Sequence, residues 1–273
     1  MPTTALVLAL AAAVGHAVWN MLLARARDPE AATAVAMLVG VAVFAVPAVV
    51  DWDVDASVWP YVLGSALFEL VYLALLARAY RHSELSLVYP LGRGVAPVLV
   101  LVFAAAVLGA GTTVAQAAGV CLVAVGVFLL RGPRREADRR GVAFGLAIAA
   151  CIAGYTLIDN SGVERGSALA YLELVIVLPA FGYAAFVLAT RGARAMRAEL
   201  NLSSVVAGLL ILTPFALFLF ALDLAPAAPV AAVRETSILI ATALGALVLK
   251  ERVGRGRWAG AVLVALGVAL VSL

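Results

Sequence analysis

Long apolar runs alternate with short polar connections along the whole chain. A hydrocarbon core ~30 Å thick takes ~20 apolar residues for one helical crossing, and backbone in lipid must satisfy its hydrogen bonds internally, which favours helices. The pattern therefore predicts an all-α polytopic membrane protein with ten transmembrane helices. Their predicted ranges are Thr3–Ala24, Ala31–Val50, Val58–Ala79, Leu85–Leu108, Thr113–Leu130, Gly141–Ile158, Ala168–Ala189, Leu202–Leu222, Pro229–Leu249 and Trp258–Leu273.

The composition agrees with this interpretation. The chain is 65% hydrophobic and 13% charged, with a mean hydropathy of +1.10, whereas soluble domains are about 25% charged. Ten crossings use nearly all of the 273 residues, so no separate soluble catalytic or nucleic-acid-binding domain is expected. The first apolar run lacks the basic segment that precedes a signal peptide, so we expect it to remain as a membrane span.

Basic residues are concentrated in every second connection. Sixteen of the 19 Lys and Arg residues lie in the odd-numbered connections, and the other three are Arg93, Arg165 and Arg234. The positive-inside rule places these basic connections in the cytoplasm and, with ten spans, both termini outside. The predicted location is the cytoplasmic (plasma or inner) membrane. The net charge of +3 then reflects topology, and no nucleic-acid partner is expected.

One segment of the chain occurs twice. Residues 119–130 (GVCLVAVGVFLL) and 260–271 (GAVLVALGVALV) share seven of twelve positions, and the same offset of 141 carries Arg93 onto Arg234. With five spans in each half, the halves must cross the membrane in opposite senses. The prediction is two inverted five-helix repeats, residues 1–130 and 141–273, joined by a cytoplasmic linker at 131–140.

Inverted repeats of this kind recur among secondary transporters, whose site lies at the interface of the halves near mid-depth. The alternative is a duplication kept for stability alone.

Ionisable side chains within the predicted spans point to a site. Each costs ~2.5–3.5 kcal/mol at mid-membrane, so such groups normally face a cavity or a partner. Arg93 and Arg234 each follow a proline near a helix start, on opposite sides of the midplane, where either or both could bind a carboxylate or phosphate group of a substrate. The alternative is internal pairing, of Arg93 with Glu69 or Glu173 and of Arg234 with Glu235. The two interpretations can coexist in alternating states.

Two of these acids are also candidates for proton coupling. Glu69 and Glu173 lie within spans, where low dielectric favours the neutral acid, so either could exchange a proton for substrate. Facilitated diffusion or exchange would need no titrating group.

Matching polar pairs occur in the first and sixth spans. His16 and Asn20 are four residues apart, as are Tyr155 and Asp159, so each pair shares one helical face. Such faces turn inward in a membrane, where they either bind substrate or brace a neighbouring helix. Trp19 lies beside Asn20 and could close over a ligand or simply pack.

The sequence offers little for catalysis or metal binding. Cys121 and Cys151 lie in apolar runs without CxxC spacing, so we expect them to be buried small hydrophobes. No HExxH, GxSxG or metal-binding acidic cluster occurs. The chain is therefore not expected to be an enzyme, and no cofactor or metal is expected.

The motifs HAVWNMLLARARDP, AYRHSELSLVYPLGRGVAP, GYTLIDNSGV and VRETSILIATALGALVLKERVGRGRWAGAVLVALGV resemble the drug/metabolite transporter (DMT) superfamily, specifically its EamA-type ten-helix exporters. The resemblance spans essentially the whole chain. It implies a five-plus-five bundle, a central cavity, and efflux of amino acids or related small metabolites, but no particular substrate. The positions that match the motifs are His16, Trp19, Asn20, Glu84, Tyr89, Arg93, Tyr155, Asp159, Arg234, Glu235 and Thr236.

The function that the sequence favours is secondary active export of a small anionic or zwitterionic, amino-acid-like metabolite by alternating access. One alternative is an exchanger of phosphorylated or lipid-linked sugars, and another is a membrane scaffold or enzyme subunit without transport. The expected partners are a small-molecule substrate and membrane lipids. The oligomeric state stays open, a homodimer included.

Overall fold

A computed structural model describes residues 1–24, 26–82, 85–107, 109, 111–130, 139–240, 243 and 254–272. The described elements are all helical apart from one isolated bridge between Val54 and Gly166. Their bounds are α1 (Thr3–Ala24), α2 (Pro29–Val50), η1 (Ala56–Val58), α3 (Trp59–His82), α4 (Leu85–Ala106), α5 (Val114–Leu130), α6 (Arg139–Gly162), η2 (Val163–Arg165), α7 (Ala168–Ala198), α8 (Leu202–Leu224), α9 (Ala227–Arg234) and α11 (Arg255–Ser272).

The helices follow the apolar runs closely, and the all-α, ten-helix fold is confirmed. Six segments, containing α1, α2, α3, α6, α7 and α8, are long and apolar enough to cross a membrane. Shorter apolar helices occur at 91–106, 114–129 and 258–271.

The ninth predicted span differs from the prediction in the part that the structure describes. Its helix α9 ends at Arg234, a turn occurs at Glu235, and residues 236–240 are helical again. The rest of Pro229–Leu249 lies mainly outside the described residues.

The seventh helix is longer than its apolar run. α7 continues nine residues past Ala189 and bends at Gly192, where φ is 80°. This is the left-handed region that favours glycine, so the bend divides a membrane-crossing part from a short basic segment that ends at Ala198.

Polar caps fix the helix starts that lie next to the connections. The Asp28 side chain accepts a hydrogen bond from the backbone N–H of Ala31 at 3.2 Å, with Pro29 in the first turn of α2. Ser167 and Asn201 cap α7 and α8 in the same way. Each cap satisfies a backbone donor that the helix leaves free, so the helices begin where the apolar runs begin.

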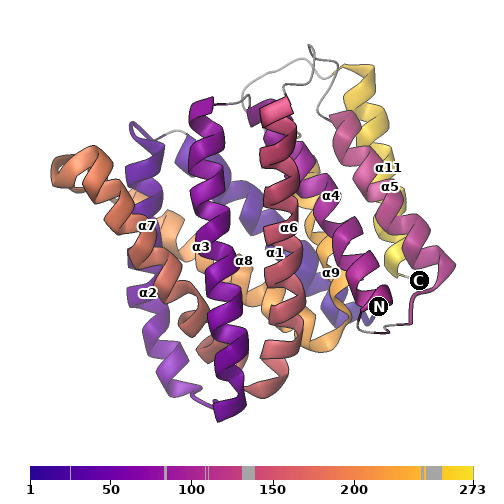
Figure 1. The fold of residues 1–273 in the computed structure, drawn as a ribbon, viewed down its shortest axis with the longest axis horizontal. Coiled ribbons are helices and arrows are strands. Elements are labelled where there is room, and N and C mark those ends of the chain that lie inside the picture. The colour runs from indigo at the N-terminus through magenta and orange to yellow at the C-terminus, as the bar shows by residue number, and fades with distance from the viewer. Residues whose placement is uncertain are drawn as a thin grey trace.

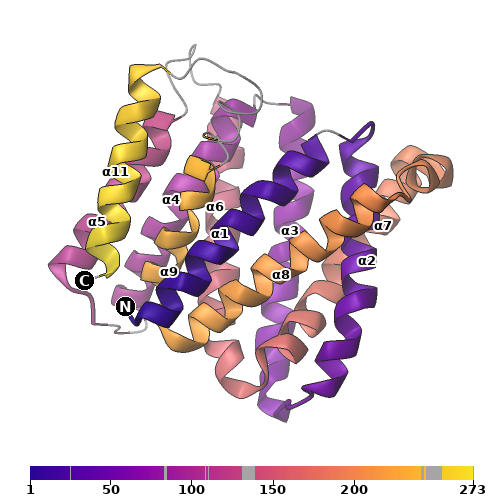
Figure 2. The same cartoon turned by 180° about the vertical axis from the view of Figure 1, so that it is seen from behind.

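Helix packing shows that the two halves are related by symmetry: when each helix is swapped for its equivalent in the other half, the pattern of contacts is preserved. Replacing each helix by its equivalent in the other half turns α1 into α6, α2 into α7, α3 into α8, α4 into α9 and α5 into α11. The packing of α1 on α8 then becomes that of α6 on α3, and the contacts of α2 with α7 and of α5 with α11 map onto themselves. In Figures 1 and 2, α1 and α8 lie on one face of the bundle and α3 and α6 on the other, whereas the pairs α2–α7 and α5–α11 lie at its two lateral edges. The inverted repeat is thus confirmed, whereas the boundaries at 130 and 141 stay predictions, since 131–138 lie outside the described residues.

The two ends of the bundle carry different connections. Both termini lie at the end where α8 turns into α9, which we call the terminal end (Figures 1 and 2). The α1–α2 and α7–α8 connections, which carry basic residues, lie at the opposite end, which we call the basic end. This alternation agrees with the predicted topology, although the side of the membrane that each end faces stays a prediction.

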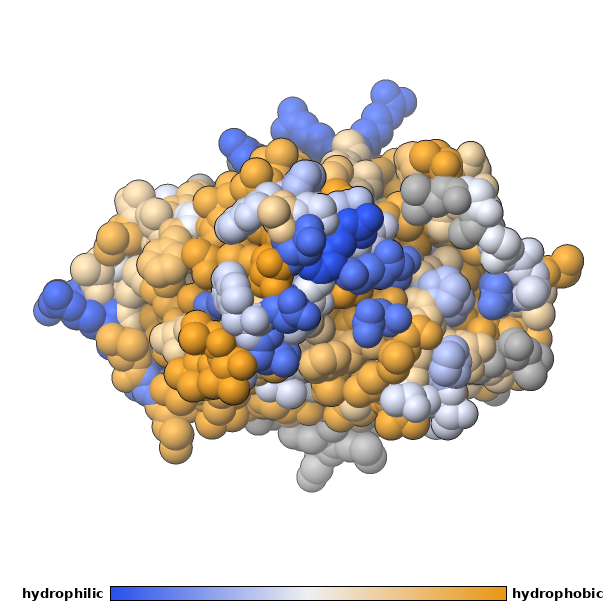
Figure 3. All heavy atoms as spheres, turned by 90° about the horizontal axis from the view of Figure 1, so that it is seen from below, coloured by the Kyte–Doolittle hydropathy of each residue, from blue (hydrophilic) through white to orange (hydrophobic). Residues whose placement is uncertain are grey.

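The surface matches a protein surrounded by lipid. Seen from the terminal end, hydrophilic residues gather in the middle of the face and apolar residues surround them (Figure 3). Exposed acids at this end include Asp51, Asp53 and Asp55. The expectation that both cysteines are buried is correct for Cys151 and wrong for Cys121, which lies on the outer side of α5, because a thiol is apolar enough to face lipid.

The two copies of the repeated segment lie in close contact with each other. An added Cβ on Gly119 of α5 would lie 2.6 Å from the carbonyl oxygen of Gly267 on α11, and one on Gly126 would lie 2.7 Å from that of Gly260. The two copies of the repeat therefore pack on each other antiparallel, with glycines that let the backbones approach.

Candidate functional site

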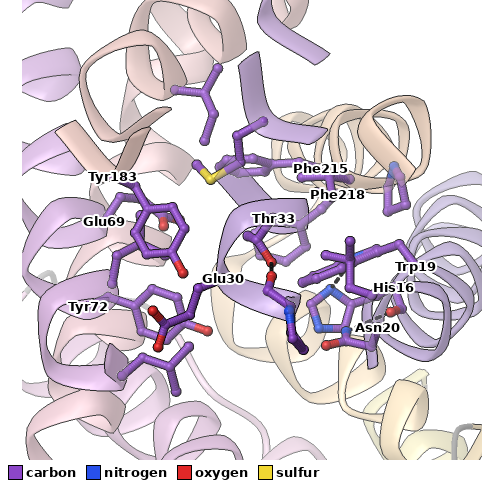
Figure 4. A pocket seen from close by; sticks show the side chains of 18 of the residues that line it. His16, Trp19, Asn20, Glu30, Thr33, Glu69, Tyr72, Tyr183, Phe215 and Phe218 are labelled. Atoms are coloured by element: carbon purple, nitrogen blue, oxygen red, sulfur yellow. Dashed lines mark hydrogen bonds between the residues drawn. The ribbon is translucent and has the colours of Figure 1, made fainter. Parts of the chain in front are cut away.

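A cavity of about 530 Å³ extends from the middle of the bundle to the basic end. Its deep part includes His16, Glu69 and Arg234, and its mouth includes Glu30 and Arg191. Residues of both halves line it. In Figure 4 the side chains of α1 lie on one side of the cavity, and Glu69 of α3 lies on the other.

Most of the site residues predicted from the sequence come together here. Those that line the cavity are His16, Trp19, Asn20, Glu69, Arg93, Tyr155 and Arg234. Glu235, Thr236, Asp159 and Glu173 are buried but do not line the cavity. Glu84 and the side chain of Tyr89 lie outside the described residues.

Arg93 is held by a buried ion pair that joins the two halves. Its Nη1 lies 3.3 Å from Oε1 of Glu235, and the two side chains are only 5% and 2% exposed. The alternative of internal pairing therefore holds for Arg93, but its partner is Glu235 in place of Glu69 or Glu173. Among the described residues, Glu235 forms no ion pair with Arg234. The interruption of the helix at Glu235 places this carboxylate toward α4, so the charge of Arg93 is balanced within the protein.

Arg234 has neutral partners. Its Nη2 donates a hydrogen bond to the hydroxyl oxygen of Tyr155 at 2.7 Å, and its guanidinium lies 4.3 Å above the ring of Phe218. Within the described part of the chain, no carboxylate forms an ion pair with it. The cavity thus contains one guanidinium whose charge is not balanced by direct contact.

His16 connects Arg93 to the α1 face of the cavity. Its Nε2 contacts the Arg93 guanidinium, while the indole N–H of Trp19 lies 3.3 Å from Nδ1. A guanidinium has donors only, so Nε2 of His16 accepts from Arg93 in this contact. Asn20 turns back and donates to the carbonyl oxygen of His16 at 2.7 Å, which braces this turn of α1.

Contacts between the α2–α3 and α6–α7 connections close the terminal end. The N–H of Ser167 donates to the carbonyl oxygen of Asp53 at 2.7 Å, and the N–H of Asp55 donates to that of Arg165 at 3.1 Å. The Arg165 guanidinium lies 4.2 Å above the ring of Tyr61.

The Asp55 carboxylate in this region accepts the N–H of Ser57 at 2.6 Å, and this hydrogen bond lowers the pKa of Asp55 below its usual value. The terminal-end contacts therefore include an ionised acid at neutral pH.

Deeper at the same end, α6 contacts α7 and α8 through side chains. Tyr171 donates its hydroxyl to Oδ1 of Asp159 at 2.8 Å, and the amide of Asn160 donates to the carbonyl oxygen of Leu222 at 2.8 Å. These bonds hold α6, α7 and α8 together at the terminal end, and among the described residues the cavity opens toward the basic end.

Charged residues at the mouth were not predicted as site residues. Nε of Arg191 lies 3.0 Å from Oε2 of Glu30 and 3.9 Å from Oδ2 of Asp28. The backbone N–H of Asp28 donates to Glu199 at 3.1 Å. The sequence placed Arg191 among the topology-determining basic residues, and no motif marks it as lining a cavity.

A ten-helix bundle of two inverted halves, with a charged central cavity open at one end, is the architecture of a membrane transporter. The sequence profile of the EamA-like transporter family matches residues 3–132 and, a second time, residues 139–273. The chain belongs to this family, and hence to the DMT superfamily.

Other comparisons agree with the fold. A solved structure described as "Crystal structure of protein" is 16% identical, with a TM-score of 0.75, over 99% of this chain and 96% of the other. At this identity the likeness shows the fold alone. The comparison with curated proteins finds no match. The family is one of transporters, which suggests that the chain is not an enzyme.

Proposed function

We propose that this membrane transporter is a secondary active transporter that exports a small zwitterionic or anionic metabolite by alternating access. The observation that carries the proposal is the difference between its two intramembrane arginines. Arg93 is paired with Glu235, whereas Arg234 lines the cavity with only neutral partners. A carboxylate entering the cavity would find its ionic partner in Arg234.

Glu69 supplies the opposite charge. It lines the same cavity and lies on the side opposite the α1 residues (Figure 4). With Arg93 and Glu235 balancing each other, Arg234 and an ionised Glu69 leave the centre without net charge. A zwitterion, whose carboxylate faces Arg234 and whose ammonium faces Glu69, leaves that balance unchanged.

The size and lining of the cavity agree with an amino-acid-like molecule. Ligand sites commonly measure ~300–1,000 Å³, and this cavity measures about 530 Å³. Trp19, Tyr72, Phe215 and Phe218 contribute aromatic surface to it, which would contact an apolar side chain of the substrate.

The exchange symmetry supports alternating access. The closed terminal end and the open basic end would change roles if the two halves exchanged their conformations. The positive-inside prediction makes the basic end cytoplasmic, so this conformation would take up substrate from the cytoplasm, as an exporter requires.

The alternative within transport is exchange of phosphorylated or lipid-linked sugars. A dianionic phosphate would need the second arginine, and Arg93 becomes available only if its ion pair with Glu235 breaks. A charge-balanced cavity therefore favours the zwitterion. A scaffold or enzyme subunit without transport is disfavoured by the family to which the chain belongs.

Ligand-induced stabilisation of the purified protein tests the proposal. A ligand that binds the folded state raises its stability by RT ln(1 + [L]/Kd), so a panel of amino acids, monocarboxylates and sugar phosphates is screened by thermal unfolding. We expect amino acids or their close analogues to raise the unfolding temperature, and liposomes containing the protein to exchange the compounds that do so.

The variants Arg234→Ala and Arg194→Ala form a matched pair, since Arg194 lies exposed beyond the bend of α7. The first should abolish the ligand effect and the second should leave it unchanged. Stabilisation by sugar phosphates alone, or an unchanged response in Arg234→Ala, would reject the zwitterion site.

A further inference from the structure

Asp159 is a carboxylic acid that is completely buried behind the cavity. It lies one helical turn beyond Tyr155 toward the terminal end and is 0% exposed. Oδ1 accepts the hydroxyl of Tyr171, whereas Oδ2 has no hydrogen-bond partner within the described part of the chain. A carboxylate with only neutral hydroxyl groups beside it and no paired cation is unfavourable in an apolar interior. Closure of the terminal end therefore favours a form of Asp159 that carries a proton or binds a cation.

The surroundings of Asp159 suit a proton. The hydroxyl of Ser65 on α3 is within hydrogen-bonding reach of the Asp159 carboxyl and has no other partner among the described residues, so it can accept a hydrogen bond from a proton carried by the acid. The titratable and charged groups that act on Asp159 are Glu69 from α3, Tyr171 from α7 and Arg234 from α9. No group of three or more His, Cys, Asp or Glu that could hold a metal ion occurs among the described residues.

Asp159 also lies within the contacts that close the terminal end. Its partner Tyr171 lies in the first turn of α7, and the next residue, Asn160, holds α6 to α8. Opening this end must separate these helices and expose the carboxyl to water. Its protonation and the closure of the terminal end are therefore linked, because the neutral acid is the form that burial favours.

We propose that Asp159 is the proton-binding site that couples this transporter to a proton gradient. The inference rests on the proposed function, in that a substrate must move by alternating access. With the terminal end open, Oδ2 takes a proton from outside water, and closure buries the neutral acid against Tyr171. With the basic end open, the proton passes to the Glu69 carboxylate and then to water in the cavity. The Asp159 carboxylate left behind favours reopening of the terminal end, so one proton enters as substrate leaves.

A measurement without substrate tests proton binding directly. Infrared difference spectra of the purified protein in lipid are recorded as pH rises, and they follow the carbonyl stretch of protonated carboxyl groups. We expect a signal in the wild-type protein that is lost in Asp159→Asn and kept in Glu173→Gln, which removes another buried acid. Tyr171→Phe keeps the carboxyl but removes its donor, and should shift the midpoint pH of the signal. An unchanged spectrum in Asp159→Asn would overturn the proposal.

Transport assays then distinguish proton coupling from the movement of substrate itself. Using a compound identified by thermal unfolding, we expect Asp159→Asn liposomes to keep counterflow, which needs no net proton movement, and to lose accumulation driven by a pH gradient. Equal accumulation in both proteins, or wild-type accumulation driven by a sodium gradient alone, would reject Asp159 as the coupling site. If the wild type shows no counterflow of any compound, the transport proposal itself fails, whereas the infrared result still reports on Asp159.

Discussion

Neutralising Glu235 should destabilise the protein more than neutralising its partner Arg93. The two charged atoms lie 3.3 Å apart, which corresponds to a gross attraction of about 5 kcal/mol at an effective dielectric of ~20. In Glu235→Gln the buried guanidinium keeps its charge, because arginine stays protonated in proteins. We expect the free energy of unfolding to fall by about 3–5 kcal/mol, the usual cost of breaking a buried pair.

The reverse change should cost less. In Arg93→Gln the remaining Glu235 can take up a proton and become neutral, which removes the uncompensated charge. The double variant Arg93→Gln/Glu235→Gln leaves no charge and should be more stable than Glu235→Gln alone. Glu164→Gln is the matched control, since its pair with Arg165 is long at 3.8 Å and Glu164 is 66% exposed, so its loss should be ~0.5 kcal/mol or less.

The assay is equilibrium unfolding of the purified protein in detergent, followed by tryptophan fluorescence and analysed as a double-variant cycle. Strictly additive losses, or a Glu235→Gln protein as stable as the wild type, would show that the ion pair between the halves contributes nothing. If Glu235→Gln were more stable than Arg93→Gln, the argument that Glu235 can become neutral when unpaired, whereas Arg93 cannot, would be refuted.

Three further predictions concern other parts of the molecule. Gly267→Ala places a Cβ 2.6 Å from the carbonyl oxygen of Gly119 and should cost about 1–3 kcal/mol of stability, whereas Gly254→Ala meets no atom within 4 Å and serves as control. Arg165→Ala removes the contact with the Tyr61 ring, which is worth ~0.5–1 kcal/mol. The rate of backbone hydrogen exchange at 163–170 should therefore rise by about two- to fivefold, whereas the rate in α5 should stay unchanged. Glu69→Gln should abolish binding of zwitterions but keep binding of monocarboxylates in thermal unfolding, and unchanged zwitterion binding would exclude Glu69 as the ammonium partner.

The fold could be predicted because membrane spans are local features. Each helix needs a run of apolar residues and a polar start, and both are visible along the chain, so α1 begins and ends where its run does. The basic connections predicted the orientation of the helices in the membrane. The repeat at an offset of 141 residues predicted the symmetry between the two halves. The turn at Glu235 could not be predicted, because it depends on a buried partner on another helix.

Seven of the predicted site residues do line the cavity, but their partners could not be predicted. Arg234 and Glu235 are neighbours in sequence, and neighbours on a helix lie about 100° apart and do not face each other, so their predicted pairing had a physical argument against it. Asp159 shares a face with Tyr155, yet four residues correspond to ~6 Å along the axis, enough to remove it from the cavity. Arg191 lines the mouth through tertiary packing that no local pattern encodes.

The crossing of α5 and α11 bears on how such a bundle can move. Gly119 meets Gly267 and Gly126 meets Gly260, so the interface is self-complementary, as in a two-fold symmetric dimer contained in one chain. If the two halves exchange their conformations, this contact stays the same. The contact of α2 with α7 stays the same for the same reason. What must change is the contact of α6 with α8, whose equivalent pair, α1 and α3, faces across the cavity (Figure 4). The pairs α5–α11 and α2–α7 can therefore keep their packing while the remaining helices move between them.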